Sequence, residues 1–277
     1  MVMQHVTRRS WKLGLALASL VSFGACADVD AMDGSELEGD VEDQEDLAQL
    51  FPRADAGTTT ATAEGDLGVG NGRDVVMIGD SWMNLGLLGL PGDGIQKALN
   101  DTGKRYRGYG IPGVKMLTAG AFGPAIPTQW PDALRQGRDI KTVIMTGGGN
   151  DVLLGGAERA DCPRGGPRCQ ELIGKITQEL KALWEKMAAA GVKDVVYIGY
   201  SENSGDGQAT PEITNTKTNG TGEACLAMTS LRCTPIDTTP IIAKNDLKAD
   251  KIHPVQPANN RIAAEVLKVM EEKGIRR

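Results

Sequence analysis

The chain has 277 residues, of which 40% are hydrophobic and 24% charged, and a formal net charge of −6 at pH 7. Four of its 30 basic and 13 of its 36 acidic residues lie in residues 1–70, so residues 71–277 hold 26 basic and 23 acidic residues. A nearly balanced segment of this length can bury a full core. Its charge gives no basis for nucleic-acid binding, and its composition excludes a wholly disordered chain.

Residues 1–27 are typical of an export signal. Basic residues at positions 8, 9 and 12 precede an apolar stretch, 13–27, that is shorter than the about twenty residues of a membrane-spanning helix. Cleavage before Cys26 would give a bacterial lipoprotein with its lipid on that cysteine, and cleavage after Ala27 would give a simple secretory protein. The paired arginines also fit a twin-arginine signal, so both Sec and Tat export stay open.

Residues 28–70 are expected to form a disordered acidic tether. Positions 28–55 hold eleven carboxylates and a single basic residue, Arg53. Such a segment buries too little apolar surface to offset the entropy lost on ordering. The folded domain is therefore predicted to span residues 71–277.

The first predicted strand leads to a serine. Four apolar residues, 75–78, are typical of a buried strand of a parallel sheet, and Gly79, Asp80 and Ser81 follow them. Sites form where such strands end, so Ser81 is the leading candidate for a nucleophile. Ser201 also follows a strand and a glycine, but it lacks the second glycine and the helix of a nucleophile elbow. It is interpreted as part of a loop at the rim of the site.

Two further segments can supply donors to an oxyanion. Residues 140–151 repeat the pattern of a strand followed by glycines and end on Asn150, whose amide can donate a hydrogen bond. Gly113, in the preceding segment, can offer a backbone N–H. A phosphate-binding loop is disfavoured, because no Gly-Lys-Ser/Thr follows the three glycines at 147–149.

The cysteines indicate disulfides. Apart from Cys26, they form two close pairs, and we predict the disulfides Cys162–Cys169 and Cys225–Cys233. Lipidation would explain the remaining thiol of Cys26. A structural zinc site is the disfavoured alternative, because no Cys-x-x-Cys is present.

The remaining periodicity predicts an α/β domain. One helix is expected to end at Gly191 and another to begin near Pro257. Two long irregular stretches, 152–168 and 201–230, are expected to line the substrate cleft, and for 201–230 a surface excursion pinned by a disulfide is an equally good alternative. Alternation of the two element types implies a parallel sheet that is covered on both faces. Strands are predicted at 75–78, 105–109, 142–145, 195–198 and 231–236. The helix that ends at Gly191 has an apolar face of Leu172, Ile176, Leu180, Leu183 and Met187. The helix that begins near Pro257 has an apolar face of Ile262, Val266 and Met270.

A serine nucleophile needs a general base, and the chain offers one histidine for that role. The chain has only two histidines, and His5 lies in the export signal, which leaves His253. Asp250 stands three residues before His253, a spacing that can bring its carboxylate to the Nδ1 side of the imidazole.

These residues in this order resemble the four sequence blocks of the SGNH hydrolases, also called the GDSL esterase/lipase family. The blocks are Gly79-Asp80-Ser81, Gly113, Gly148-Gly149-Asn150-Asp151 and Asp250-Lys251-Ile252-His253-Pro254. The resemblance implies a three-layer α/β/α sandwich with a flavodoxin-like, five-stranded parallel sheet. It also implies a triad of Ser81, His253 and Asp250, and an oxyanion hole formed by Ser81, Gly113 and Asn150. Trp82 departs from the leucine that names the family, which affects packing or the shape of the acyl pocket more than the mechanism.

The resemblance predicts an exported serine esterase that acts on short acyl esters, such as acetyl esters of a glycan, without a metal or organic cofactor. The alternatives are a lysophospholipase or thioesterase, an O-acyltransferase, and a tethered glycan-binding module without turnover. The expected location is the bacterial cell envelope, as an outer-membrane lipoprotein or in the periplasm, with secretion as the alternative. A membrane would be contacted only through a lipid on Cys26, and the sequence carries no signal for an oligomeric state.

Overall fold

The structure is a computed structural model that describes most of the predicted folded domain. The described residues are 74–86, 92–104, 106–137, 139–154, 161–162, 165–202, 204 and 220–275. The predicted export signal, the lipidation site at Cys26 and the acidic tether all lie outside these residues.

A five-stranded parallel sheet with the order β2-β1-β3-β4-β5 forms the centre of the domain. Its strands are β1 (Val75–Ile78), β2 (Arg107–Gly108), β3 (Thr142–Met145), β4 (Asp194–Ile198) and β5 (Arg232–Ile236). Every residue of β1, β3 and β4 is buried, as expected for central strands covered on both faces. The predicted fold class is confirmed.

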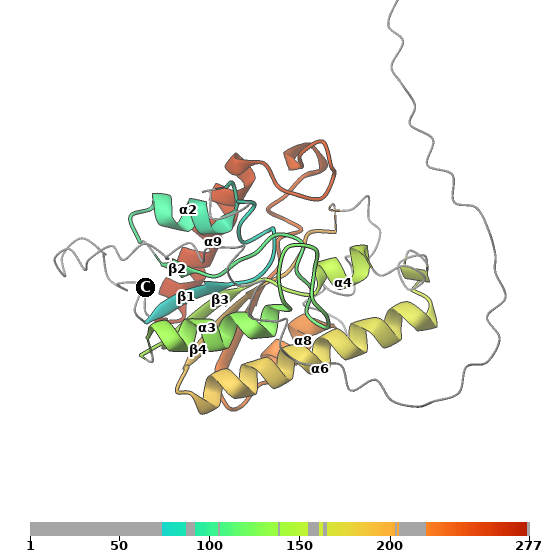
Figure 1. Ribbon diagram of the computed structural model, residues 1–277. Coiled ribbons are helices and arrows are strands. Elements are labelled where there is room, and N and C mark those ends of the chain that lie inside the picture. Colours follow the sequence, from blue (N-terminus) through green and yellow to red (C-terminus); the bar gives the residue numbers. More distant parts are fainter. Residues whose placement is uncertain are drawn as a thin grey trace, which may run out of the picture. The chain divides into compact units, whose positions relative to one another are not determined.

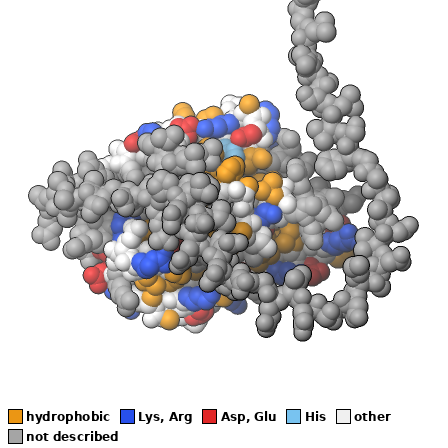
Figure 2. Space-filling view, viewed as in Figure 1, with side chains coloured by type: hydrophobic (Ala, Val, Ile, Leu, Met, Phe, Trp, Pro, Cys, Tyr) orange, Lys and Arg blue, Asp and Glu red, His pale blue; other side chains and the backbone are white. Residues whose placement is uncertain are grey.

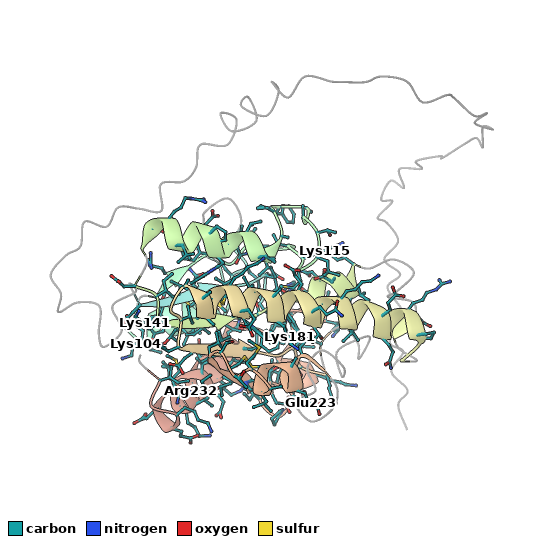
Figure 3. All side chains as sticks on the ribbon, turned by 90° about the horizontal axis from the view of Figure 1, so that it is seen from below. Lys104, Lys115, Lys141, Lys181, Glu223 and Arg232 are labelled. Carbon is teal, nitrogen blue, oxygen red and sulfur yellow. A yellow bond between two sulfur atoms is a disulfide. The ribbon has the colours of Figure 1, made fainter. Side chains whose placement is uncertain are left out.

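Helices cover both faces of this sheet. Helices α2 (Ile95–Asp101) and α9 (Gln256–Glu272) pack together on one face, and α3 (Gln129–Gln136) and α6 (Pro167–Ala189) lie on the opposite face (Figure 1). Seen from below, α3 and α6 run across the front of the sheet (Figure 3). The shorter elements are α4 (Gly149–Leu153), α8 (Thr221–Leu226) and the 3-10 helices η2 (Ile126–Thr128) and η5 (Lys244–Asp246).

The long helix α6 follows the predicted apolar periodicity and ends where the sequence predicts. Ile176, Leu180, Leu183 and Met187 are fully buried, whereas Leu172 is half-buried and Ile173 takes the inner position. Gly191 has a φ of 96°, and the N–H of Val192 donates to the carbonyl of Met187 at 3.1 Å. This left-handed glycine and the bond behind it form a Schellman-type end.

The stretch 201–230, expected to be irregular, contains helix α8. Its residues 221–226 form one and a half turns, with Thr221 and Cys225 buried, and the disulfide from Cys225 to β5 holds the helix against the sheet. A helix this short has too little periodicity to be recognised from sequence, as is also true of α2, α3 and α4. Within the two proposed cleft-lining stretches, residues 155–160, 163–164, 203 and 205–219 lie outside the described residues.

Both predicted cysteine pairs are disulfide-bonded. Cys162 and Cys169 have their Cα atoms 4.8 Å apart, and Cys225 and Cys233 have theirs 5.0 Å apart. Because all four sulfurs are joined in disulfide bonds, these cysteines are not available as ligands of the alternative zinc site. Disulfides of this kind indicate an oxidising compartment. Among the helices that the structure describes, none combines the length and apolar character needed to cross a bilayer.

Removing the Cys225–Cys233 disulfide is expected to lower the free energy of unfolding by about 2 to 3 kcal/mol, because the unfolded chain regains the freedom of a short closed loop. The test is urea denaturation of the double variant Cys225→Ala, Cys233→Ala beside the wild type under oxidising conditions. Alanine keeps the two buried sites apolar. Equal unfolding free energies for the two proteins would contradict the prediction.

Candidate active site

The nucleophile candidate Ser81 lies in a tight turn at the carboxyl end of β1. Gly79 begins this turn with a φ of 154°, and a Cβ at this position would lie 2.2 Å from Oγ1 of Thr146, so only glycine fits between β1 and the end of β3. The side-chain amide of Gln129 in α3 donates to the carbonyl of Gly79 and accepts from its N–H, each at 2.8 Å. These contacts fix the backbone immediately before Ser81.

Ser81, His253 and Asp250 form a continuous hydrogen-bonded chain. Oγ of Ser81 lies 2.8 Å from Nε2 of His253, although the two residues are 172 positions apart in the sequence. Nδ1 of His253 lies 2.7 Å from Oδ2 of Asp250. The hydroxyl, the imidazole and the carboxylate therefore stand in the order required for general-base activation of a serine.

A short loop after η5 holds the acid and the histidine in this geometry. Oδ1 of Asp250 accepts hydrogen bonds from the backbone N–H groups of Ile252 at 2.9 Å and His253 at 3.0 Å. Lys251, which lies between Asp250 and Ile252, has a φ of 60°. The N–H of Lys248 closes the loop by donating to the carbonyl of His253 at 2.7 Å. Asp250 thus contacts the imidazole with one oxygen and its own loop with the other.

The environment of this triad favours a negative charge on Asp250 and leaves the histidine within reach of solvent. Burial acts to raise the pKa of Asp250, but the hydrogen bonds from the backbone and imidazole of His253 outweigh it and hold that pKa below its usual value. The His253 side chain is 17% exposed, and Ser81 is 6% exposed. Figure 2 shows the imidazole in pale blue at the surface, next to hydrophobic side chains.

The loop that carries Gly113 runs beside the turn of Ser81. The N–H of Ile111 donates to the carbonyl of Gly79 at 3.1 Å, and the side-chain amide of Asn84 donates to the carbonyl of Gly110 at 3.3 Å. Within the described residues, no group accepts a hydrogen bond from the N–H of Ser81 or of Gly113. Neither N–H is therefore committed to another described residue, as a donor to an incoming oxygen requires.

Asn150 and Asp151, at the start of α4, hold this same loop from the other side. Nδ2 of Asn150 donates to the carbonyl of Val114 at 2.9 Å, which leaves a second amide hydrogen for another acceptor. Asp151 accepts from the N–H of Met116 at 2.7 Å and from the N–H of Leu117 at 3.0 Å. Burial raises the pKa of Asp151 against the effect of these two bonds. The structure thus joins Asn150 to the loop of Gly113, as a shared oxyanion site requires.

Directly behind the nucleophile lies a buried carboxylate, that of Asp80, which is 1% exposed. Its Oδ1 accepts from the N–H of Trp82 at 3.0 Å and from Oγ1 of Thr146 at 3.1 Å, and its Oδ2 accepts from the hydroxyl of Tyr200. Burial raises the pKa of Asp80, although the hydrogen bonds that it accepts oppose this rise. One side chain therefore connects the ends of β1, β3 and β4.

Sequence reasoning did not identify Gln129, Thr146 or Tyr200 as neighbours of the nucleophile. The only available signal was that Thr146 and Tyr200 each follow a predicted strand whose carboxyl end faces the site. The rival serine, Ser201, is fully buried beside Tyr200, which is incompatible with attack on a bound substrate.

Phe122 is another residue that the sequence did not indicate. It is 62% exposed, in a turn closed by the bond from the N–H of Gly120 to the carbonyl of Gly123 at 2.9 Å. A Cβ built on Gly113 would lie 3.0 Å from Cδ2 of Phe122, so the ring packs directly against Gly113. An exposed aromatic side chain therefore adjoins Gly113, whose N–H is a candidate oxyanion donor.

Solved structures with this arrangement of elements include esterases. The native M. smegmatis aryl esterase matches with a TM-score of 0.50 and 14% identity over 72% of this chain and 99% of that chain. A member of the lipolytic protein G-D-S-L family from Veillonella parvula DSM 2008 matches with a TM-score of 0.46 and 14% identity, over 72% of this chain and 98% of that one. An acetyl esterase mutant with an acetate ion matches with a TM-score of 0.46 and 13% identity, over 72% and 98%.

No protein-family model and no curated protein sequence matches the chain. At 14% identity, the likeness to the aryl esterase shows the fold alone, and this fold is like the one that the sequence resemblance to SGNH hydrolases implies. The sequence resemblance and the structural comparison thus lead to the same three-layer fold.

Proposed function

We propose that this chain is an exported serine esterase. The observation that carries the proposal is the hydrogen-bonded chain from Ser81 through His253 to Asp250. His253 accepts the Ser81 proton on Nε2 as Oγ attacks the ester carbonyl, and the carbonyl oxygen gains negative charge. The N–H groups of Ser81 and Gly113 and the second amide hydrogen of Asn150 stabilise that charge.

The remaining steps restore the enzyme. His253 gives its proton to the leaving alcohol as the carbon–oxygen bond breaks, which leaves the acyl group on Ser81. A water molecule then attacks the acyl-enzyme, and His253 takes a proton from it and returns that proton to Oγ of Ser81. No step requires a metal or an organic cofactor.

The surface beside the site supports a short acyl group. A long chain would gain about 0.8 kcal/mol for each buried CH₂, and so would need an extended apolar surface next to the carbonyl. Three large hydrophobic side chains are exposed in the described part of the chain: Phe122, Leu154 and Leu226. Of these, Phe122 packs against Gly113. Acetyl esters of a glycan fit both this surface and a location in the cell envelope, for which the export signal and the disulfides argue.

A graded panel of acyl esters tests the proposal. We expect kcat/KM to be highest for acetyl esters and to fall as the acyl chain lengthens, and we expect acetate release from an acetylated polysaccharide. Preference for long acyl chains or for a lysophospholipid would contradict the proposed substrate but not the esterase. Absence of turnover on every ester, with substrate binding retained, would favour the alternative of a silent glycan-binding module.

A further inference from the structure

Tyr200 lies between two parts of the proposed active site, the turn that carries Ser81 and the start of α4 that carries Asn150. It lies two residues after β4 and is 4% exposed, and its ring packs edge-on against Trp82 with centroids 5.0 Å apart. Trp82 directly follows the nucleophile. Tyr200 therefore contacts the turn of Ser81 from inside the protein, where no substrate reaches.

Tyr200 contacts both the turn of Ser81 and the segment that carries Asn150. Its hydroxyl donates to Oδ2 of Asp80, the residue before Ser81. Its ring packs against Gly149, the residue before Asn150. Burial raises the pKa of Tyr200 well above its ordinary value, so the hydroxyl stays protonated and remains a donor at neutral pH.

Gly149 lies so close to the ring of Tyr200 that no larger side chain fits at this position. A Cβ on Gly149 would lie 2.8 Å from Cζ of Tyr200, so the third glycine of the segment 147–149 makes room for the tyrosine. The sequence pattern therefore reflects close contact between the start of α4 and Tyr200.

Asp80 links Tyr200 to the backbone on both sides of Ser81. Its carboxylate accepts from the N–H of Trp82, and its own N–H donates to Oγ1 of Thr146 at 3.2 Å. The backbone on both sides of Ser81 is thus held by groups that meet at Asp80. Loss of one donor from this carboxylate would loosen the turn of Ser81 relative to Gly149 and Asn150.

We infer that Tyr200 is a positioning residue for the reaction. Its hydroxyl holds Asp80 while its ring packs against Gly149, and these two contacts together set the placement of Ser81 relative to Asn150. The inference rests on the proposed esterase function. Tyr200 touches neither the substrate nor the reacting atoms, so it acts only through these two neighbours. A misplacement of about 1 Å at a reacting group can lower a rate by about 100-fold.

The test is Tyr200→Phe, with Tyr197→Phe as the matched control. Tyr197 is also a buried tyrosine at the end of β4, 1% exposed, and its hydroxyl donates to the carbonyl of Gly147 at 3.0 Å without contacting Asp80. Each variant loses one buried hydroxyl. We expect Tyr200→Phe to lower kcat by about 10- to 100-fold with little change in KM, and to slow fluorophosphonate labelling of Ser81 by a similar factor.

For Tyr197→Phe, we expect a comparable loss of stability with kcat close to that of the wild type. A merely structural role of Tyr200 would instead give the two variants equal kcat, and this result would overturn the inference. A wild-type protein that neither hydrolyses esters nor reacts with the fluorophosphonate would overturn the proposed function itself, and the inference with it.

A double variant separates action through Asp80 from a general loss of packing. If Tyr200 acts through Asp80, the change Tyr200→Phe in an Asp80→Asn background should lower kcat by less than about threefold, because contacting residues are not additive. A full additional 10- to 100-fold loss in that background would contradict the route through Asp80.

Discussion

Replacement of Ser81 by alanine is expected to lower kcat for ester hydrolysis by about 10⁶-fold, because no other group in the site can form the acyl-enzyme. The protein should stay folded, since alanine fits the space of a serine that is 6% exposed and the contacts of Gly79 and Asp80 to α3 and β3 remain. The measurement is kcat on a short acyl ester, together with circular dichroism. His253→Ala should have an effect of similar size, because its Nε2 is the acceptor for the Ser81 proton.

Ser201→Ala is the matched control for Ser81→Ala. Ser201 also follows a buried strand and a Gly-x dipeptide, but it is fully buried. We expect this variant to keep its activity. Substantial turnover by a folded Ser81→Ala protein, or loss of turnover in Ser201→Ala at unchanged stability, would show that the nucleophile is misassigned.

The second large effect is expected for Asp250→Asn, with a loss of about 10⁴-fold in kcat. The oxygen of an asparagine can still accept from the N–H groups of Ile252 and His253, so the loop keeps its shape. Its NH₂ group, however, would face Nδ1 of His253 and favour the tautomer that carries the proton on Nε2. That tautomer cannot accept the proton of Ser81.

Asp246→Asn provides a control in the same loop region. Asp246 also accepts a backbone hydrogen bond, from Ala243 at 2.8 Å, and it pairs with Arg261 at 2.6 Å without contacting His253. We expect its kcat to stay near that of the wild type, as measured on the same ester. Equal losses in the two variants would mean that Asp250 acts on the fold and not on the imidazole.

Much of the fold follows from local patterns in the sequence. The apolar runs of β1, β3 and β4 and the apolar face of α6 predict the sheet and its cover, because both depend on the spacing of residues within one element. The contact between Ser81 and His253 could be predicted because only one histidine lies outside the export signal. Asp250 could be predicted because its contact with His253 is local.

The contacts behind the site could not be predicted in this way. Tyr200 and Asp80 are 120 positions apart, and Gln129 and Gly79 are 50 apart, and no periodicity links such pairs. They meet because parallel strands bring their carboxyl ends to one edge of the sheet. Which polar side chains then pair depends on the packing of several elements at once, for example on the space that Gly149 leaves for Tyr200.

Reaction with a fluorophosphonate tests most directly whether Ser81 is an activated nucleophile. The full chain would be incubated with the probe, digested, and mapped by mass spectrometry beside Ser81→Ala and His253→Ala. We expect a single adduct on Ser81 in the wild type and none on either variant. An adduct on another serine, or no adduct on the folded wild-type protein, would contradict this prediction.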